Sequence, residues 1–242
     1  MILLVDIGNS AIKWAEVRQN NLTVQKSTLY NLVDLEQILT RVWLPINKPE
    51  AVWISNVAGP RIEAIITSWV DKRWKCYPNF VKTVSYQCGV KNGYKKPEQL
   101  GIDRWLALIG VYGLGIESSC VIVDCGTAVT IDVLRVDGQH LGGVIAPGLK
   151  MMQTALAQNT HKLTHSNQHL TKFSLANETN DGIIMGTSYA VLGLLEYVTN
   201  KLNGRSKLIL TGGDTVVIKP FLSKTHQYIP DLVLQGLKTV SS

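Results

Sequence analysis

The stretch that decides the fold is the first ten residues, Met1-Ile-Leu-Leu-Val-Asp6-Ile-Gly8-Asn9-Ser10. A short apolar run that ends at a turn signal is typical of a buried strand. The Asp-x-Gly-Asn-Ser at its end predicts a tight turn, in which Gly8 lets the backbone approach a ligand closely. Asn9 and Ser10 offer donors to phosphate oxygens. Asp6 is placed to bind Mg²⁺, which usually takes one or two carboxylates together with phosphates.

The same plan returns in the middle of the chain, in the segment Cys120-Val-Ile-Val-Asp124-Cys-Gly126-Thr127-Ala128. Each copy leads into another strand-like stretch, at 11–17 and at 129–134. A single Asp-x-Gly is also a common strand-end turn, because short motifs match often by chance. Two copies in matching contexts, nearly half a chain apart, favour a repeat instead. We therefore expect two similarly built halves, residues 1–117 and 118–242, that face each other across a nucleotide cleft.

Length and composition set broad limits. A chain of 242 residues forms one large or two small domains, and an apolar share of 45% is typical of a globular protein. The net charge of +6 suits anionic ligands such as nucleotides and also permits nucleic acid, although solvated lysines give the same charge. The sequence contains no nucleic-acid recognition motif that we can identify, so we expect no nucleic-acid partner.

Cysteine usage and hydropathy predict a cytoplasmic protein. The four cysteines form no Cys-x-x-Cys pair, which favours reduced thiols; they are Cys76, Cys88, Cys120 and Cys125. Asp6 interrupts the N-terminal apolar run and no basic segment precedes it, so we expect no signal peptide. The apolar region 106–116 is too short and too rich in glycine to cross a bilayer, so we expect no membrane partner.

Apolar periodicity and turn residues predict the remaining elements. Helical spacing occurs at 32–42, 60–74 and 179–203, and a further helix follows Trp105. Short apolar runs predict strands at 22–25, 51–54 and 207–210. Asp137-Gly138 predicts a hairpin between strands at 129–136 and 140–145. The final apolar run, 230–237, is expected to be a short strand or edge segment.

A second informative stretch is Gly101-Ile102-Asp103-Arg104, which falls at or near the start of the helix that follows Trp105. The helix macrodipole favours a carboxylate at that position as the anion, so Asp103 could accept a proton from a substrate hydroxyl. Arg104 offers a forked donor for a carboxylate or phosphate. The alternative is that Asp103 caps the helix and Arg104 lies on the surface, and the residues alone do not separate these two interpretations.

Two further patterns are weak. His161, His165 and His169 recur every four residues, as ligands on one helix face would, but no carboxylate or cysteine joins them. A loop or frayed helix is therefore favoured over a metal site. Gly143 and Gly148 have the spacing of a P-loop, but Leu149 stands where lysine is required, so that interpretation is rejected.

Taken together, these motifs resemble the type III pantothenate kinase family, within the superfamily of acetate and sugar kinases, Hsp70 and actin. The resemblance covers nearly the whole chain and rests on several ordered motifs: Asp6-Ile-Gly-Asn-Ser10 with Lys13 and Trp14; Tyr94 ahead of Gly101-Ile-Asp-Arg104-Trp; Asp124-Cys-Gly-Thr127-Ala-x-Thr130; Gly142-Gly-x-Ile-x-Pro-Gly148; Thr179 before a helix; and Thr211-Gly-Gly-Asp214. It implies an α/β fold of two ribonuclease-H-like halves, with mixed sheets flanked by helices, as in actin-like ATPases.

The resemblance also implies an activity: ATP-dependent phosphorylation of the primary hydroxyl of pantothenate, the first step of coenzyme A biosynthesis, by a homodimer. It implies that Asp103 is the general base and that Asp124 binds a monovalent cation, K⁺ or NH₄⁺. The residues implied in ATP binding are Asp6, Ile7, Gly8, Asn9, Ser10, Ala11, Ile12, Lys13 and Thr127, with Asp6 near Mg²⁺. Those implied in pantothenate binding are Tyr94, Gly101, Ile102, Asp103, Arg104 and Thr179.

Two other functions remain as alternatives. One is a non-catalytic accessory or regulatory protein on the same fold, although the intact Asp6, Asp103 and Asp124 argue against it. The other is a different small-molecule kinase, against which only the resemblance of the segment from Tyr94 to Arg104 argues. Turnover with pantothenate separates all three.

Overall fold

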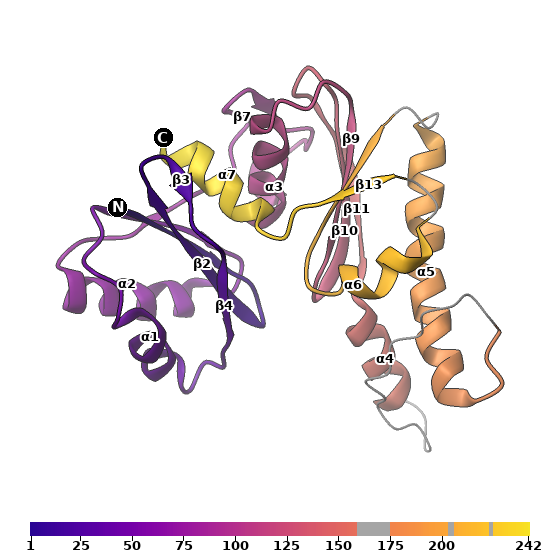
Figure 1. Cartoon of the computed structure of the whole chain (residues 1–242), viewed down its shortest axis with the longest axis horizontal. Helices are drawn as coiled ribbons and strands as arrows, with labels where there is room; N and C mark the ends of the chain where they lie inside the picture. Colours follow the sequence, from indigo (N-terminus) through magenta and orange to yellow (C-terminus); the bar gives the residue numbers. More distant parts are fainter. Residues whose placement is uncertain (159–174, 203–205, 223–224) are drawn as a thin grey trace. The chain divides into compact units, whose positions relative to one another are not determined.

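The structure is a computed structural model that describes residues 1–158, 175–202, 206–222 and 225–242. By its contacts the chain divides into two compact units, Met1–Gly115 together with Asp231–Ser242, and Ile116–Pro230. Each unit contains one mixed sheet flanked by helices, as the sequence predicts (Figure 1). The three histidines at 161, 165 and 169 lie outside the described residues, so their expected loop or frayed helix stays a prediction.

The sheet of the first unit has the strand order β3-β2-β1-β5-β6, and β4 also pairs with β2. β1 pairs antiparallel with β2 and parallel with β5, and β5 pairs parallel with β6. The strands are β1 (Ile2–Ile7), β2 (Ala11–Arg18), β3 (Asn21–Leu22), β4 (Lys26–Leu29), β5 (Ala51–Asn56) and β6 (Asn79–Phe80). The expected single strand at 22–25 is therefore wrong: β3 ends at Leu22 and β4 begins at Lys26.

Two helices cover one face of this sheet, α1 (Leu35–Trp43) and α2 (Pro60–Trp74). The second has the predicted bounds, whereas the first begins three residues later than expected. Their apolar sides pack on alternate residues of β1, among them Leu3, Val5 and Ile7, and four tryptophans at 14, 43, 69 and 74 form an aromatic cluster there. Because side chains alternate along a strand, Asp6 belongs to the opposite face.

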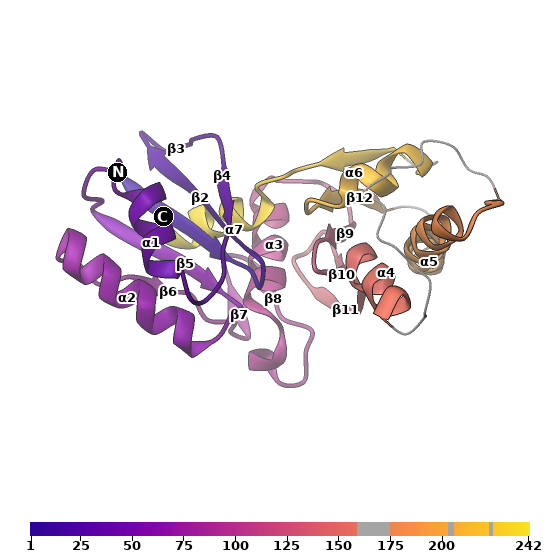
Figure 2. The ribbon, with the colours of Figure 1, turned by 90° about the horizontal axis from the view of Figure 1, so that it is seen from below.

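That opposite face contacts α7 (Leu232–Ser241), which packs closely on α3 (Ile102–Gly113) (Figure 2). The expected strand at 230–237 is therefore wrong, because this segment is helical. It also belongs to the first unit, so the expected second half, 118–242, differs from the observed unit at its C-terminal end. Short apolar runs do not distinguish strand from helix by pattern alone, and packing on a partner decides.

The segment between β6 and α3 contains the short strands β7 (Tyr86–Gln87) and β8 (Val90–Lys91) and one turn of 3₁₀ helix, η1 (Pro97–Gln99).

The second unit repeats the plan of the first, with the strand order β11-β10-β9-β12-β13. β9 pairs antiparallel with β10 and parallel with β12, as β1 does with β2 and β5. The strands are β9 (Cys120–Cys125), β10 (Ala128–Leu134), β11 (His140–Pro147), β12 (Lys207–Thr211) and β13 (His226–Tyr228). The predicted hairpin at Asp137-Gly138 is confirmed, since β10 and β11 pair antiparallel.

Helices cover one face of the second sheet: α4 (Leu149–Gln158), α5 (Thr179–Lys201), α6 (Thr215–Ile218) and the 3₁₀ turn η2 (Lys219–Phe221). Residues Val191 and Leu195 of α5 lie in a core with Val121 and Val123 of β9. By length and composition, α5 is one helix among the described residues that could cross a membrane. Its role in this core accounts for the apolar composition of its inner side.

The close packing of α3 on α7 depends on two glycines. A Cβ at Gly236 would overlap the backbone oxygen of Leu106, and a Cβ at Gly110 would lie 2.6 Å from the backbone oxygen of Leu232. Backbone atoms cannot move aside as the end of a flexible side chain can. The close approach of α7 to α3 is therefore possible only because these two positions carry no side chain.

We expect Gly236→Ala to lower the free energy of unfolding by about 2 kcal/mol or more, because overpacking forces backbone shifts. Gly193→Ala is the matched control, since Gly193 lies inside α5 with nothing within 4 Å of an added Cβ. There the substitution is expected to stabilise by roughly 0.5–1 kcal/mol, because glycine is unfavourable inside a helix. Urea denaturation measures both, and equal effects of the two substitutions would contradict the account.

Candidate active site

The first Asp-x-Gly turn joins β1 to β2. Asp6 is paired with Lys13 across the antiparallel ladder and with Ser55 across the parallel one. The Gly8 N–H donates to the Ala11 oxygen at 3.0 Å, which closes the predicted tight turn. Asn9 and Ser10 are exposed at its tip. The turn therefore presents small polar residues beside a carboxylate, as the sequence predicts.

Asp6 is buried, with 7% of its surface exposed. Burial raises the pKa of its carboxyl group to about 6, and the negative charge of Asp103 raises that pKa further, whereas Lys13 and the Ser55 hydroxyl lower it. No group among the described residues forms a hydrogen bond of normal geometry with Asp6 Oδ1 or with the Ser55 hydroxyl, and both atoms are buried. Two carboxylates and an unpaired buried oxygen suit a hard cation such as Mg²⁺.

Asp103 lies on the second residue of α3, and Gly101 occupies the N-cap position. The alternative in which Asp103 caps the helix is therefore wrong. Its Oδ1 accepts the N–H of Arg104 at 2.8 Å. A Cβ at Gly101 would lie 2.6 Å from this oxygen, so glycine at that position leaves room for the carboxylate. The Asp103 carboxylate therefore lies in the first turn of α3, where the macrodipole favours an anion.

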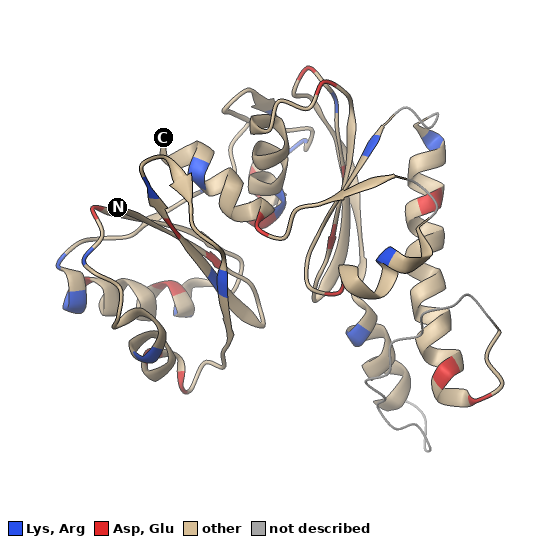
Figure 3. Cartoon of the chain, in the orientation of Figure 1, with Lys and Arg blue, Asp and Glu red and all other residues tan. Residues whose placement is uncertain are grey.

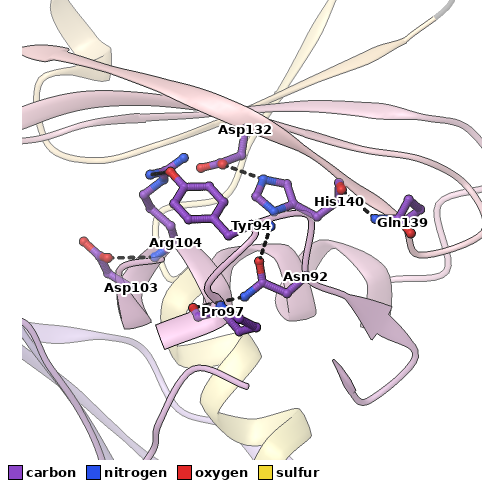
Figure 4. A network of polar contacts seen from close by, with 8 residues as sticks. All are labelled: Asn92, Tyr94, Pro97, Asp103, Arg104, Asp132, Gln139 and His140. Atoms are coloured by element: carbon purple, nitrogen blue, oxygen red, sulfur yellow. Dashed lines mark hydrogen bonds and ion pairs between the residues drawn. The ribbon is translucent and has the colours of Figure 1, made fainter. Parts of the chain in front are cut away.

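Arg104 does not lie on the surface, because only 6% of the residue is exposed. Its Nη1 donates to the Tyr94 hydroxyl at 2.8 Å, and its guanidinium carbon lies 5.6 Å from the centre of the Tyr94 ring. Asn92 fixes the Tyr94 loop: its Oδ1 accepts the Tyr94 N–H at 2.9 Å, and its Nδ2 donates to the Pro97 oxygen at 3.3 Å (Figure 4). The same Nδ2 donates to the Val84 oxygen at 3.3 Å. The structure thus brings Tyr94, Asp103 and Arg104 together, as the sequence predicts.

The second Asp-x-Gly turn joins β9 to β10. Asp124 is paired with Thr130 across the antiparallel ladder and with Thr211 across the parallel one, which are the positions that Lys13 and Ser55 occupy around Asp6. The Gly126 N–H donates to the Ala128 oxygen at 3.0 Å. Asp124 also lies on the sheet face opposite the core that contains Val123 and Cys125. The two turns are therefore equivalent positions of a repeated sheet.

Other glycine turns pack tightly against this second turn. A Cβ at Gly148 would overlap the backbone oxygens of Gly126 and Thr127, and the Gly148 N–H donates to Thr127 at 3.0 Å. Gly212, with φ of +90°, has no room for a Cβ because Asp124 Oδ1 and the Cys125 oxygen are too close. The Thr127 backbone and the Asp124 carboxylate are therefore held by neighbours that only glycine allows.

Thr179 is the first residue of α5 and is exposed. No described contact links it to a site, so its role stays a prediction.

Sequence reasoning also missed three residues that the structure singles out. Ser55 and Tyr30 adjoin the first turn, and His140 Nε2 lies 2.8 Å from Asp132 Oδ1 inside the second unit. Each depends on strand register between distant segments, which no local motif records.

Among the residues that the structure describes, charged side chains do not gather into a separate site. Figure 3 shows Lys and Arg spread over elements of both units, with Asp and Glu among them. Within the described residues, no group of three or more His, Cys, Asp or Glu side chains could hold a metal ion by itself. A metal at Asp6 would therefore need oxygens from a ligand as well, as Mg²⁺ bound with phosphates has.

A repeated mixed sheet with an aspartate-ended hairpin in each copy is the architecture of the actin-like fold. Structures at low identity show the same fold: an activator of 2-hydroxyisocaproyl-CoA dehydratase from Clostridium difficile with bound ADPNP matches at a TM-score of 0.55 and 11% identity, covering 99% of this chain and 92% of that one. An ethanolamine utilization protein from Carboxydothermus hydrogenoformans matches at 0.56 and 14%, covering 98% and 89%. The predicted fold class is confirmed.

The chain belongs to the type III pantothenate kinase family, whose model matches residues 2–201. A type III pantothenate kinase of Nitrosococcus oceani is 37% identical over 100% of this chain and 94% of its own length. One from Hydrogenovibrio crunogenus is 34% identical over 99% and 98%. A Campylobacter jejuni structure assigned to the Baf family of transcriptional activators matches at a TM-score of 0.62 and 24% identity, covering 98% and 96%, and shows the fold alone. The chain is therefore a kinase of this family, with ATP and pantothenate as the family's substrates.

The raised pKa of Asp6 predicts a pH-dependent stability. The pKa of Asp6 is raised from its ordinary value of 3.8 to about 6 in the folded protein. At pH values between these two, the native state binds more protons than the unfolded state, so the free energy of unfolding falls as the pH rises through this range. Asp6→Asn removes this penalty. We therefore expect the free energy of unfolding of the variant, minus that of wild type, to increase by roughly 1–3 kcal/mol as the pH rises from 4 to 8. Urea denaturation with EDTA measures it, and a difference between variants that does not change with pH would contradict the assignment.

Proposed function

We propose that this chain phosphorylates pantothenate with Asp103 as the general base. The observation that supports the proposal most is the cluster in which Asp103, Arg104 and Tyr94 meet at the start of α3, within electrostatic range of Asp6. The Asp103 carboxylate can accept a proton from a hydroxyl group, and the buried Arg104 guanidinium can bind a carboxylate. The cluster therefore suits a substrate that carries both a hydroxyl and a carboxylate. Pantothenate carries both groups.

The proposed step is a phosphoryl transfer. The primary hydroxyl oxygen of pantothenate attacks the γ-phosphorus of ATP, a new oxygen–phosphorus bond forms, and the bond to the β-phosphate oxygen breaks with its electrons on ADP. The hydroxyl proton goes to a carboxylate oxygen of Asp103. Little covalent chemistry is asked of the protein, so most of the acceleration comes from positioning and from neutralising charge. Arg104 and Tyr94 hold the acceptor, with Gly101 and Ile102 beside them, and we include Thr179 by family resemblance.

The phosphates are assigned to the two turns. By motif match, Asp6, Ile7, Gly8, Asn9, Ser10, Ala11, Ile12, Lys13 and Thr127 bind ATP. The fit of Asp6 to Mg²⁺ rests on its unpaired buried Oδ1 and on the nearby negative charge of Asp103. When bound, Mg²⁺ neutralises phosphate charge. Asp124 is proposed to bind K⁺ or NH₄⁺, and its packing against Gly212 supports a carboxylate held in a fixed place.

We also propose a cytoplasmic homodimer that binds neither nucleic acid nor membrane. The support for the dimer is family resemblance alone. Light scattering tests it, and a mass near the 26.7 kDa of one chain would contradict it.

The general-base assignment predicts that Asp103→Asn lowers kcat by about 100-fold or more, since a positioned base contributes roughly 10²–10⁴ in rate. ATP binding, measured by calorimetry, is expected to persist. Glu98→Gln is a matched control, because Glu98 is an exposed carboxylate of η1. A wild-type kcat in Asp103→Asn would rule out the base assignment, whereas loss of ATP binding would indicate a damaged site.

A further inference from the structure

The first Asp-x-Gly turn is braced by Tyr30, a residue with no assigned role. Tyr30 follows β4, which pairs antiparallel with β2 so that Leu29 lies opposite Ala11. Continuing this register by one residue places Tyr30 opposite Ser10. Strand pairing, not proximity in sequence, therefore brings the tyrosine to the turn.

Tyr30 makes two hydrogen bonds to the turn. Its hydroxyl donates to the Gly8 oxygen at 2.8 Å, and its backbone N–H donates to the Ser10 oxygen at 3.4 Å. The Gly8 N–H already donates to the Ala11 oxygen at 3.0 Å. Both backbone polar groups of Gly8 are thus bonded within the protein, and one of them depends on a side-chain hydroxyl.

The bond to Gly8 has a consequence for the next residue. A trans peptide is planar, so the C=O of Gly8 and the N–H of Asn9 point in opposite directions. The Tyr30 hydroxyl therefore fixes the direction of the Asn9 N–H as well. Without this bond the peptide would rotate more easily, because the glycine on one side of it tolerates a wide range of backbone angles.

We propose that Tyr30 is a positioning residue for nucleotide binding: by holding the Gly8–Asn9 peptide, it keeps the Asn9 N–H directed as a donor to the polyphosphate of ATP. The inference rests on the proposed function, in which this turn binds the phosphates. Tyr30 itself touches no reacting atom. A fixed donor binds an anion more tightly than one that must first be ordered, because less conformational entropy is lost.

Tyr30→Phe tests this, since it removes the hydroxyl and keeps the ring. One hydrogen bond contributes about 0.5–1.5 kcal/mol, so we expect the dissociation constant for ATP to rise about 3–10-fold. The constant for AMP, which lacks the β- and γ-phosphates, should not change, nor should the KM for pantothenate. Calorimetry and initial rates measure these values. Tyr86→Phe is the matched control, because Tyr86 is 65% exposed in the same unit.

Four outcomes separate the possibilities. Weaker ATP binding with unchanged AMP binding supports the inference. Wild-type ATP affinity in Tyr30→Phe, or equal weakening of ATP and AMP with a lowered melting temperature, would overturn it, because the hydroxyl would then serve no purpose or only stability. If wild type itself binds ATP no more tightly than AMP, the proposed phosphate role of the turn fails, and the inference fails with it.

Discussion

The structure depends on burying a carboxylate at the end of the central strand of a sheet. The charged form of Asp6 loses hydration there, which is why its pKa is raised to about 6. The sheet tolerates it because Lys13 is paired with it on one neighbouring strand and Ser55 on the other. Such a site suits a cation, because a bound positive charge offsets the free-energy cost of burying the charged carboxylate.

The same constraint appears twice. Asp124 is paired on both sides, as Asp6 is, but its partners on the neighbouring strands are Thr130 and Thr211 in place of Lys13 and Ser55. The copies are not chemically equal, because the first turn has a lysine opposite its aspartate and the second has a threonine. This difference fits the separate roles that we propose for them, phosphate and Mg²⁺ at the first turn and a monovalent cation at the second. The repeated fold thus supplies two similarly placed carboxylates whose neighbours differ.

Much of this could be predicted from the sequence, because the decisive features are local. Asp6 and Asp124 follow apolar runs and precede glycines, so the sequence predicts both the strands and the turns. It also predicts the start of α3, from Gly101 to Arg104. The α7 helix was not, because its apolar residues fit either a strand or a helix, and the packing of Gly236 on Leu106 decides between them. Ser55 and Tyr30 were missed for a related reason: their roles follow from pairing with distant strands.

We propose that this site transfers phosphate from ATP to pantothenate. The most direct test is ADP release by the wild-type chain with Mg²⁺-ATP, with and without pantothenate, in matched K⁺ and Na⁺ buffers. We expect ADP release that requires pantothenate and is much faster in K⁺. A folded preparation that releases no ADP in response to pantothenate in either buffer would contradict it, and would favour an accessory protein or a kinase for a different hydroxyl acceptor.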